Sequence, residues 1–171
     1  IYKAFSDLGD LKEVLPKKKS ANYILILGST VSSMRKRIMF LNKMIKTKKI
    51  ILTPSSKLVF LSGDRKLAPQ ETPEVLVSTT PYLQRKEWKR PHSLPGNELE
   101  LAPFLWEQLD LTPELSKIQP IYIESPKRKG TARATTADTV TEFLKTYPVK
   151  PGAVLIISQN PFITYQKLII E

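Results

Sequence analysis

The sequence predicts an α/β fold of three layers, in which helices cover both faces of a mostly parallel sheet. Three observations predict it. Short apolar runs without polar interruption are typical of strands that are buried on both faces. Segments with apolar residues at three- and four-residue spacing separate these runs. Small or polar residues follow the runs, as they do in strand-to-helix turns.

The first apolar run is "NYILILG", residues 22–28, where we predict a buried strand. Apolar residues then recur at helical spacing over 31–45, with lysine and arginine on the other faces. This pattern predicts an amphipathic helix with Ser29 or Thr30 as its N-cap. Two further short apolar runs follow, "KIILT" over 49–53 and "KLVFLSG" over 57–63. The second is predicted to be a strand that also ends in a small-residue turn.

Residues 64–96 are predicted to form a long, Pro-rich, irregular excursion. Proline stands at positions 69, 73, 81, 91 and 95, which disfavours long regular elements. A short helix or a hairpin is expected around "EVLVSTTPYLQ", residues 74–84. An irregular segment of this length within a compact domain is usually functional or mobile.

The remaining elements follow in the same alternation. They are a helix over 98–109, a strand over 120–124, a helix over 135–147, a strand over 152–158 and a helix that begins near Phe162. Asn97 is the expected N-cap of the first of these helices. Right-handed crossovers turn this alternation into a parallel sheet. We therefore expect one Rossmann-like domain over residues 1–171, with residues 1–20 as an N-terminal arm.

The composition narrows the classes of partner. There are 27 lysines and arginines against 16 aspartates and glutamates, a formal charge of +11, which favours a phosphorylated ligand, nucleic acid or an anionic membrane. Nucleic acid is disfavoured among these, because Trp88 is the only aromatic residue within a basic cluster. The absence of cysteine and the single His92 exclude thiolate and multi-histidine metal sites. We predict no metal site.

Ligands of parallel sheets bind where the strands end. The first such loop is Gly28, Ser29 and Thr30, where unpaired N–H groups of a helix N-terminus could hold an anion. The sequence lacks both G-x-G-x-x-G and G-x-x-x-x-G-K-[ST], so a plain strand-to-helix turn is the alternative.

The loop "SGDRKLAPQE" follows the second strand. Arg65 could bind a phosphate or carboxylate in bidentate fashion, or pair with Glu71 within the fold. Asp64 could act as a helix cap, a general base or a magnesium ligand. Both interpretations of Arg65 stay open.

The loop "SPKRKGTARA" follows the third strand and places basic residues 127–129 and Arg133 around a Gly-Thr turn, which is a reasonable anion site. The alternative is a solvated loop in which Thr135 caps the next helix. Asp138 lies in the first turn of that helix, where an acidic side chain complements the helix dipole.

Acid–base chemistry would depend on carboxylates, because His92 stands alone in a Pro-rich loop. If the domain is an enzyme, the candidate catalytic residues are Glu71, Glu98 and Asp138.

The order of these pieces resembles a bacterial family of unknown-function domains that includes the SanA, YdcF and ElyC envelope proteins. "ILILGST" followed by Arg37 is similar to the family's first strand and helix. "VFLSGD" is similar to a strand ending Ser-Gly-Gly, with Asp64 in place of the second glycine. Glu98, or Glu100, in "NELELAPFL" corresponds to a family glutamate.

Two further motifs extend the resemblance. "IYIESPKRKGTARATTAD" is similar to a strand ending in glutamate followed by Arg-Asn-Thr-x-Glu-Asn. "VLIISQNPFITYQ" is similar to a strand ending Thr-Ser, but Phe162 and Tyr165 stand where the family has histidine and arginine. A changed or lost ancestral activity is therefore expected. In "IYIESPKRKGTARATTAD", the residues that match the family motif are Glu124, Arg133, Thr135 and Asp138.

The resemblance implies binding of a nucleotide-type ligand such as S-adenosylmethionine, a link to envelope biogenesis, and a cytoplasmic or envelope-associated location. We predict a small anionic or nucleotide-like ligand. The alternative is a non-catalytic protein that uses its basic surface and residues 80–95, with Tyr82 and Trp88, to bind a protein, membrane or nucleic acid. The predicted contacts are Gly28, Ser29, Thr30, Arg37, Ser62, Gly63, Asp64, Arg65, Glu124, Arg133, Thr135, Ser158 and Asn160.

Overall fold

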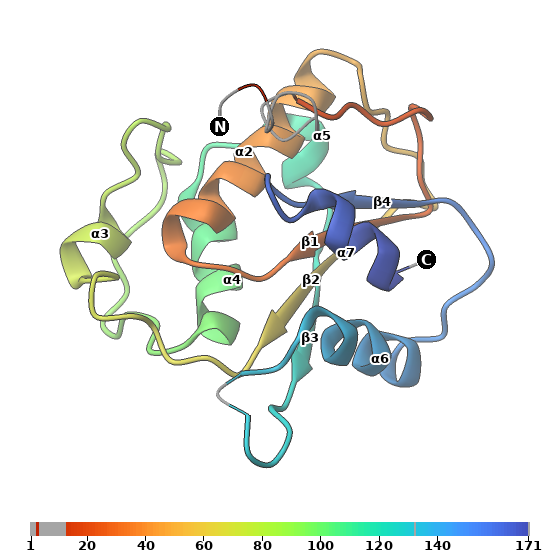
Figure 1. The fold of residues 1–171 in the computed structure, drawn as a ribbon. Helices are drawn as coiled ribbons and strands as arrows, with labels where there is room; N and C mark the ends of the chain where they lie inside the picture. Colours follow the sequence, from red (N-terminus) through yellow and green to blue (C-terminus); the bar gives the residue numbers. More distant parts are fainter. Residues whose placement is uncertain (1–2, 4–12, 132, 171) are drawn as a thin grey trace.

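One parallel sheet forms the centre of the protein (Figure 1). The computed structural model describes residues 3, 13–131 and 133–170, so most of the predicted N-terminal arm lies outside the described residues. The four strands lie in the order β3-β2-β1-β4, and each neighbouring pair is parallel. The predicted fold class is thereby confirmed. The strands are β1 (Tyr23–Leu27), β2 (Lys57–Gly63), β3 (Ile121–Ser125) and β4 (Val154–Ile157).

Helices cover both faces of the sheet, as the apolar runs predict. Alternate residues of β1 point to opposite faces: Ile24 and Ile26 pack in the larger core, whereas Leu25 and Leu27 pack in the smaller one. The larger core lies under α2 (Val31–Lys46), α4 (Glu98–Gln108) and α5 (Pro113–Ser116). The smaller core lies under α6 (Thr136–Thr146) and α7 (Ile163–Ile170).

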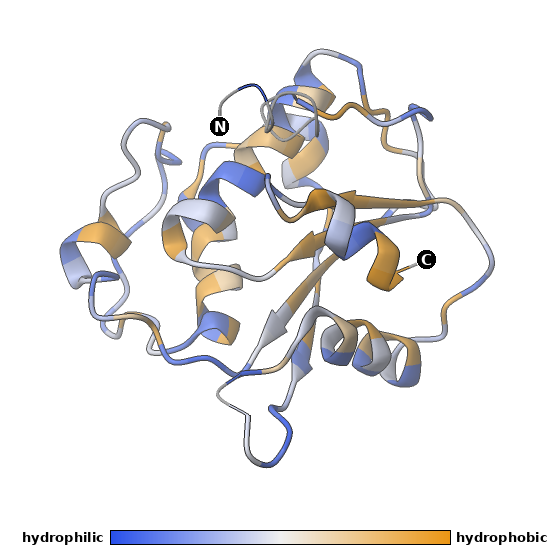
Figure 2. Ribbon diagram, in the orientation of Figure 1, coloured by the Kyte–Doolittle hydropathy of each residue, from blue (hydrophilic) through white to orange (hydrophobic). Residues whose placement is uncertain are grey.

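The strands differ in exposure along the sheet. Every residue of β1 is buried, and Figure 2 shows β1 and β4 mainly in the hydrophobic colour. The edge strand β3 alternates instead, since Tyr122 and Glu124 are exposed while Ile123 is buried. This face of β3 is therefore only partly covered by α4.

The excursion 64–96 contains the short helix α3 (Pro73–Val77). Arg35 of α2 fixes it by donating hydrogen bonds to the carbonyl oxygens of Val75 at 2.8 Å and Leu76 at 2.7 Å. Arg35 also donates to the side-chain oxygen of Gln108 at 2.9 Å. The excursion is therefore attached to the two main helices. Among the described residues, no helix has both the length and the apolar character that a bilayer crossing requires.

Candidate functional site

The strand order creates a topological switch point between β1 and β4. The chain leaves β1 for α2 on one face of the sheet and leaves β4 for α7 on the other face. The loops 28–30 and 158–162 therefore diverge above neighbouring strand ends (Figure 1). In open parallel sheets, ligands bind in the crevice at such a position.

A carboxylate of the protein itself occupies the first N–H group of α2. Thr30 is the N-cap residue, but its side chain makes no capping hydrogen bond. Glu71, from the excursion, instead accepts the N–H of Val31 at 2.7 Å. The same carboxylate accepts the N–H of Ala68 at 2.7 Å, and its side chain is only 3% exposed. Glu71 thus fills part of the predicted anion position.

Arg65 joins Glu71 to the start of α4. Its guanidinium donates to Glu71 at 2.8 Å and to Glu98 at 2.9 Å. The other oxygen of Glu98 accepts the N–H of Gly63 at 3.2 Å. The internal ion pair that the sequence left open is therefore present, and Arg65 has two carboxylate partners.

The protonation of this cluster follows from its contacts. Burial alone would raise the pKa of Glu71, but hydrogen bonds from Arg65, Ala68 and Val31 outweigh burial and lower that pKa. Burial alone would likewise lower the pKa of Arg65, but its bonds to Glu71 and Glu98 raise it. Glu71 and Arg65 therefore stay charged at neutral pH.

Gly28 and Arg37 close the end of β1. A Cβ at Gly28 would lie 2.0 Å from an oxygen of Glu98, so only glycine permits this approach. Arg37 is 3% exposed and donates to the carbonyl oxygens of Leu27 and Gly28. Burial lowers the pKa of Arg37 to about 10, partly offset by Glu98. Arg37 thus connects α2 to the end of β1.

The β3–α6 loop combines a helix cap with free cationic groups. Thr135 and Asp138 form a reciprocal capping box, and Asp138 also pairs with Arg128. Hydrogen bonds from Thr135, and then Arg128, lower the pKa of Asp138. Arg133 is exposed and makes no hydrogen bond or ion pair with a described residue. Ala134 lies against Gly63, with 3.2 Å to a Cβ placed there.

The loop after β4 contributes polar groups at the switch point. Ser158 donates a hydrogen bond to the side-chain oxygen of Gln166 on α7. Gln159 lies beside it, and its side-chain oxygen is buried and accepts no hydrogen bond from a described residue. Gln159 is not among the predicted contacts. Its place between the predicted contacts Ser158 and Asn160 was the signal that could have found it.

A separate hollow of about 300 Å³ lies between α4 and the exposed face of β3. The predicted contacts Ser62 and Glu124 line it. Tyr122, which was not predicted, lines it as well, and its alternation with Glu124 in "IYIES" is the signal for an exposed strand face. In the part of the chain that the structure describes, no group of three or more acidic or histidine side chains could hold a metal.

The structure thus divides the predicted contacts among several places. Arg65, Glu71 and Glu98 form one ion-pair cluster. Gly63 donates its N–H to Glu98, Gly28 lies against the same carboxylate, and Arg37 donates to the carbonyl oxygen of Gly28. Asp64 donates its backbone N–H to the carbonyl oxygen of Ser125, at the end of β3. Comparison of the chain with protein-family models, curated proteins and solved structures finds no match, so the family resemblance stays a prediction.

Proposed function

We propose that this chain is a Rossmann-like domain that binds a small anionic or nucleotide-like ligand at the switch point between β1 and β4. The observation that supports it is the divergence of the loops 28–30 and 158–162 above adjacent strand ends. The resemblance to the SanA, YdcF and ElyC proteins favours a nucleotide such as S-adenosylmethionine and a role in the cell envelope.

The ligand would meet groups that the fold leaves available. The N–H groups of Ser32 and Ser33 lie in the first turn of α2, where a helix provides no internal acceptors. The side-chain oxygen of Gln159 can accept a hydrogen bond from a hydroxyl or amine of the ligand. Arg133 can supply positive charge. Arg65 and Arg37 support the site from inside, because their own partners already engage them.

Thermal unfolding in the presence of ATP, S-adenosylmethionine, glucose 6-phosphate and inorganic phosphate tests this proposal. A ligand at 100 times its Kd stabilises the folded state by about 2.7 kcal/mol, which raises the Tm by about 5–11 °C. We expect a saturable rise with at least one of these compounds.

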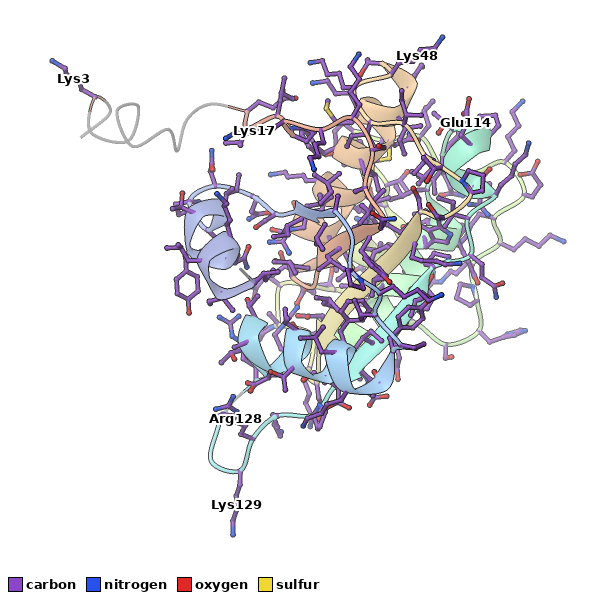
Figure 3. All side chains as sticks on the ribbon, turned by 90° about the vertical axis from the view of Figure 1, so that its right-hand side faces the viewer. Lys3, Lys17, Lys48, Glu114, Arg128 and Lys129 are labelled. Carbon is purple, nitrogen blue, oxygen red and sulfur yellow. The ribbon has the colours of Figure 1, made fainter. Side chains whose placement is uncertain are left out.

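Matched variants separate a specific site from general charge attraction. Arg133→Ala and Gln159→Ala should reduce the rise, whereas Lys17→Ala should not, since Lys17 lies at the opposite end of the molecule from the loop that carries Arg128 and Lys129 (Figure 3). The absence of any saturable rise, or an equal reduction by Lys17→Ala, would contradict the proposal.

The alternative function uses residues 80–95 as a docking segment. Its two aromatic residues, Tyr82 and Trp88, pack against the larger core, and the Trp88 ring meets Phe104 edge-to-face at 5.8 Å. These rings therefore contribute to attaching the segment, and nothing in its described contacts favours docking over this internal role. Binding of a partner through this segment stays a prediction.

A further inference from the structure

The hollow beside β3 is independent of the proposed anion site. Ser62 of β2 and Glu124 of β3 are partners in the register of the two strands, so their side chains project from the same face. Tyr122, two residues before Glu124, projects from that face as well. The hollow has a volume of about 300 Å³. Its α4 wall consists of Leu99, Glu100 and Pro103.

Ser62 carries an unsatisfied hydroxyl at this hollow. Ser62 is only 3% exposed, and its Oγ makes no hydrogen bond with any residue that the structure describes. Buried hydroxyl groups in proteins nearly always have a partner, because leaving one without a partner is costly. A hydroxyl that lines a hollow can be satisfied by a group bound there.

The charged residues that line the hollow are both acidic. Glu100 is held in place, because its carboxylate accepts the N–H of Gly96 at 2.7 Å and a side-chain N–H of Asn97 at 3.1 Å. Glu124 is exposed and has no hydrogen bond or ion pair with a described residue. The charge of the residues that line the hollow is thus negative, although the formal charge of the whole chain is +11. This negative charge favours a positively charged ligand.

The other walls favour an organic cation over a metal ion. Leu99, Pro103 and Tyr122 offer apolar surface, and the described residues contain no group of three carboxylates or histidines that could bind a metal. Tyr122 is 41% exposed, and its ring is fixed by stacking on Phe60 at 5.4 Å. Aromatic rings attract organic cations and their alkyl stems.

We infer that the hollow between α4 and β3 binds an organic cation with N–H groups, namely a protonated amine or guanidinium on a short apolar stem. Glu124 neutralises the charge, the Ser62 hydroxyl accepts an N–H, and Tyr122 contacts the stem. Free alkylamines and the basic side chains of peptides share this chemistry.

Titration of the ¹⁵N-labelled protein by NMR tests the inference. The probes are n-butylammonium and n-butylguanidinium for free cations, and N-acetyl-lysine methylamide for a peptide side chain. At about 0.15 M salt, where the Debye length is about 8 Å, the repulsion by the net charge is largely screened. We expect saturable shifts of the amides of residues 62, 99–100 and 122–124, and the tightest probe identifies the source.

Variants make the test specific. Ser62→Ala and Glu124→Gln should each weaken binding about tenfold, as expected for the loss of one hydrogen bond to a charged group. Ser62→Ala removes no hydrogen bond of the fold, so the variant should unfold at the wild-type Tm or above it. Glu114→Gln is the charge-matched control, because Glu114 belongs to α5 and does not line the hollow.

Four results would overturn the inference. They are shifts that do not saturate, wild-type affinity in both hollow variants, equal binding of tetramethylammonium, which has no N–H group, and equal binding of butyrate, which has the opposite charge.

Discussion

Replacing Glu71 with alanine tests whether a carboxylate of the excursion stabilises the start of α2. The side chain is 3% exposed and accepts hydrogen bonds from Val31, Ala68 and Arg65. Removing one partner of a buried ion pair costs about 3–5 kcal/mol. Arg65 keeps Glu98 as a partner and its own side chain is 17% exposed, so we expect the lower end of this range, about 3 kcal/mol.

Urea denaturation at neutral pH measures this loss. In thermal unfolding, the same loss of about 3 kcal/mol corresponds to a fall in Tm of about 6–12 °C for a domain of this size. Glu107→Gln is the control, because Glu107 is exposed and makes no hydrogen bond or ion pair with a described residue. Its free energy of unfolding should change by less than about 0.5 kcal/mol. A loss below about 1 kcal/mol in Glu71→Ala would refute the reasoning.

The pH dependence gives an independent check. The pKa of Glu71 in the folded state lies below its usual value of 4.5. Its contribution is therefore complete above about pH 4.5 and is lost as the pH falls through the folded pKa. The stability difference between wild type and Glu71→Ala should narrow in that acidic range. Added formate should also raise the Tm of Glu71→Ala more than that of wild type, because it can replace the missing carboxylate.

Three further predictions concern the frame around the site. Gly28→Ala should cost about 2 kcal/mol, since the new Cβ would lie 2.0 Å from Glu98, whereas Gly96→Ala, with its nearest atom at 3.7 Å, should change stability by less than about 0.5 kcal/mol. Arg35→Ala should cost about 3 kcal/mol and speed amide exchange in α3, because three hydrogen bonds are lost; unchanged exchange would contradict this. Thr135→Val should cost about 1 kcal/mol in urea denaturation through the capping box, and an unchanged midpoint would exclude that role.

The sequence predicts the elements whose signals are local. The apolar run of β1 and the three- and four-residue spacing of α2 agree with the structure within one or two residues at each end. Thr135 caps α6 through Asp138, three positions later, so this contact is also readable from the sequence. By contrast, the apolar run "KIILT" over 49–53 forms no strand, although Ile50 is buried. Burial of one side chain by a loop cannot be distinguished from a short strand by hydropathy alone.

The contacts of the site depend instead on long-range placement. Glu71 reaches Val31 across 40 positions of sequence, and Arg65 reaches Glu98 across 33. No periodic pattern encodes such pairs, because they follow from how the excursion returns over the strand ends. The sequence identified both carboxylates as candidates for acid–base chemistry. It could not show that Arg65 holds the two of them.

The distribution of charge decides where an anionic ligand can bind. The net charge of +11 suggests a basic site, yet Arg65 is balanced by Glu71 and Glu98, and Arg37 is engaged by backbone carbonyl groups. Affinity for an anion at the switch point must therefore depend on the N–H groups of α2 and on the cationic β3–α6 loop.

Two variants show whether the anion takes the N–H of Val31 from Glu71 or binds outside that carboxylate. If the anion displaced Glu71, the Glu71→Ala variant would bind it more tightly than wild type, since its competitor would be gone. If the anion binds outside Glu71, that variant keeps the wild-type Kd and Arg133→Ala weakens binding. The geometry favours the second outcome, because Glu71 is almost fully buried and has three hydrogen-bond donors to give up before a ligand could replace it.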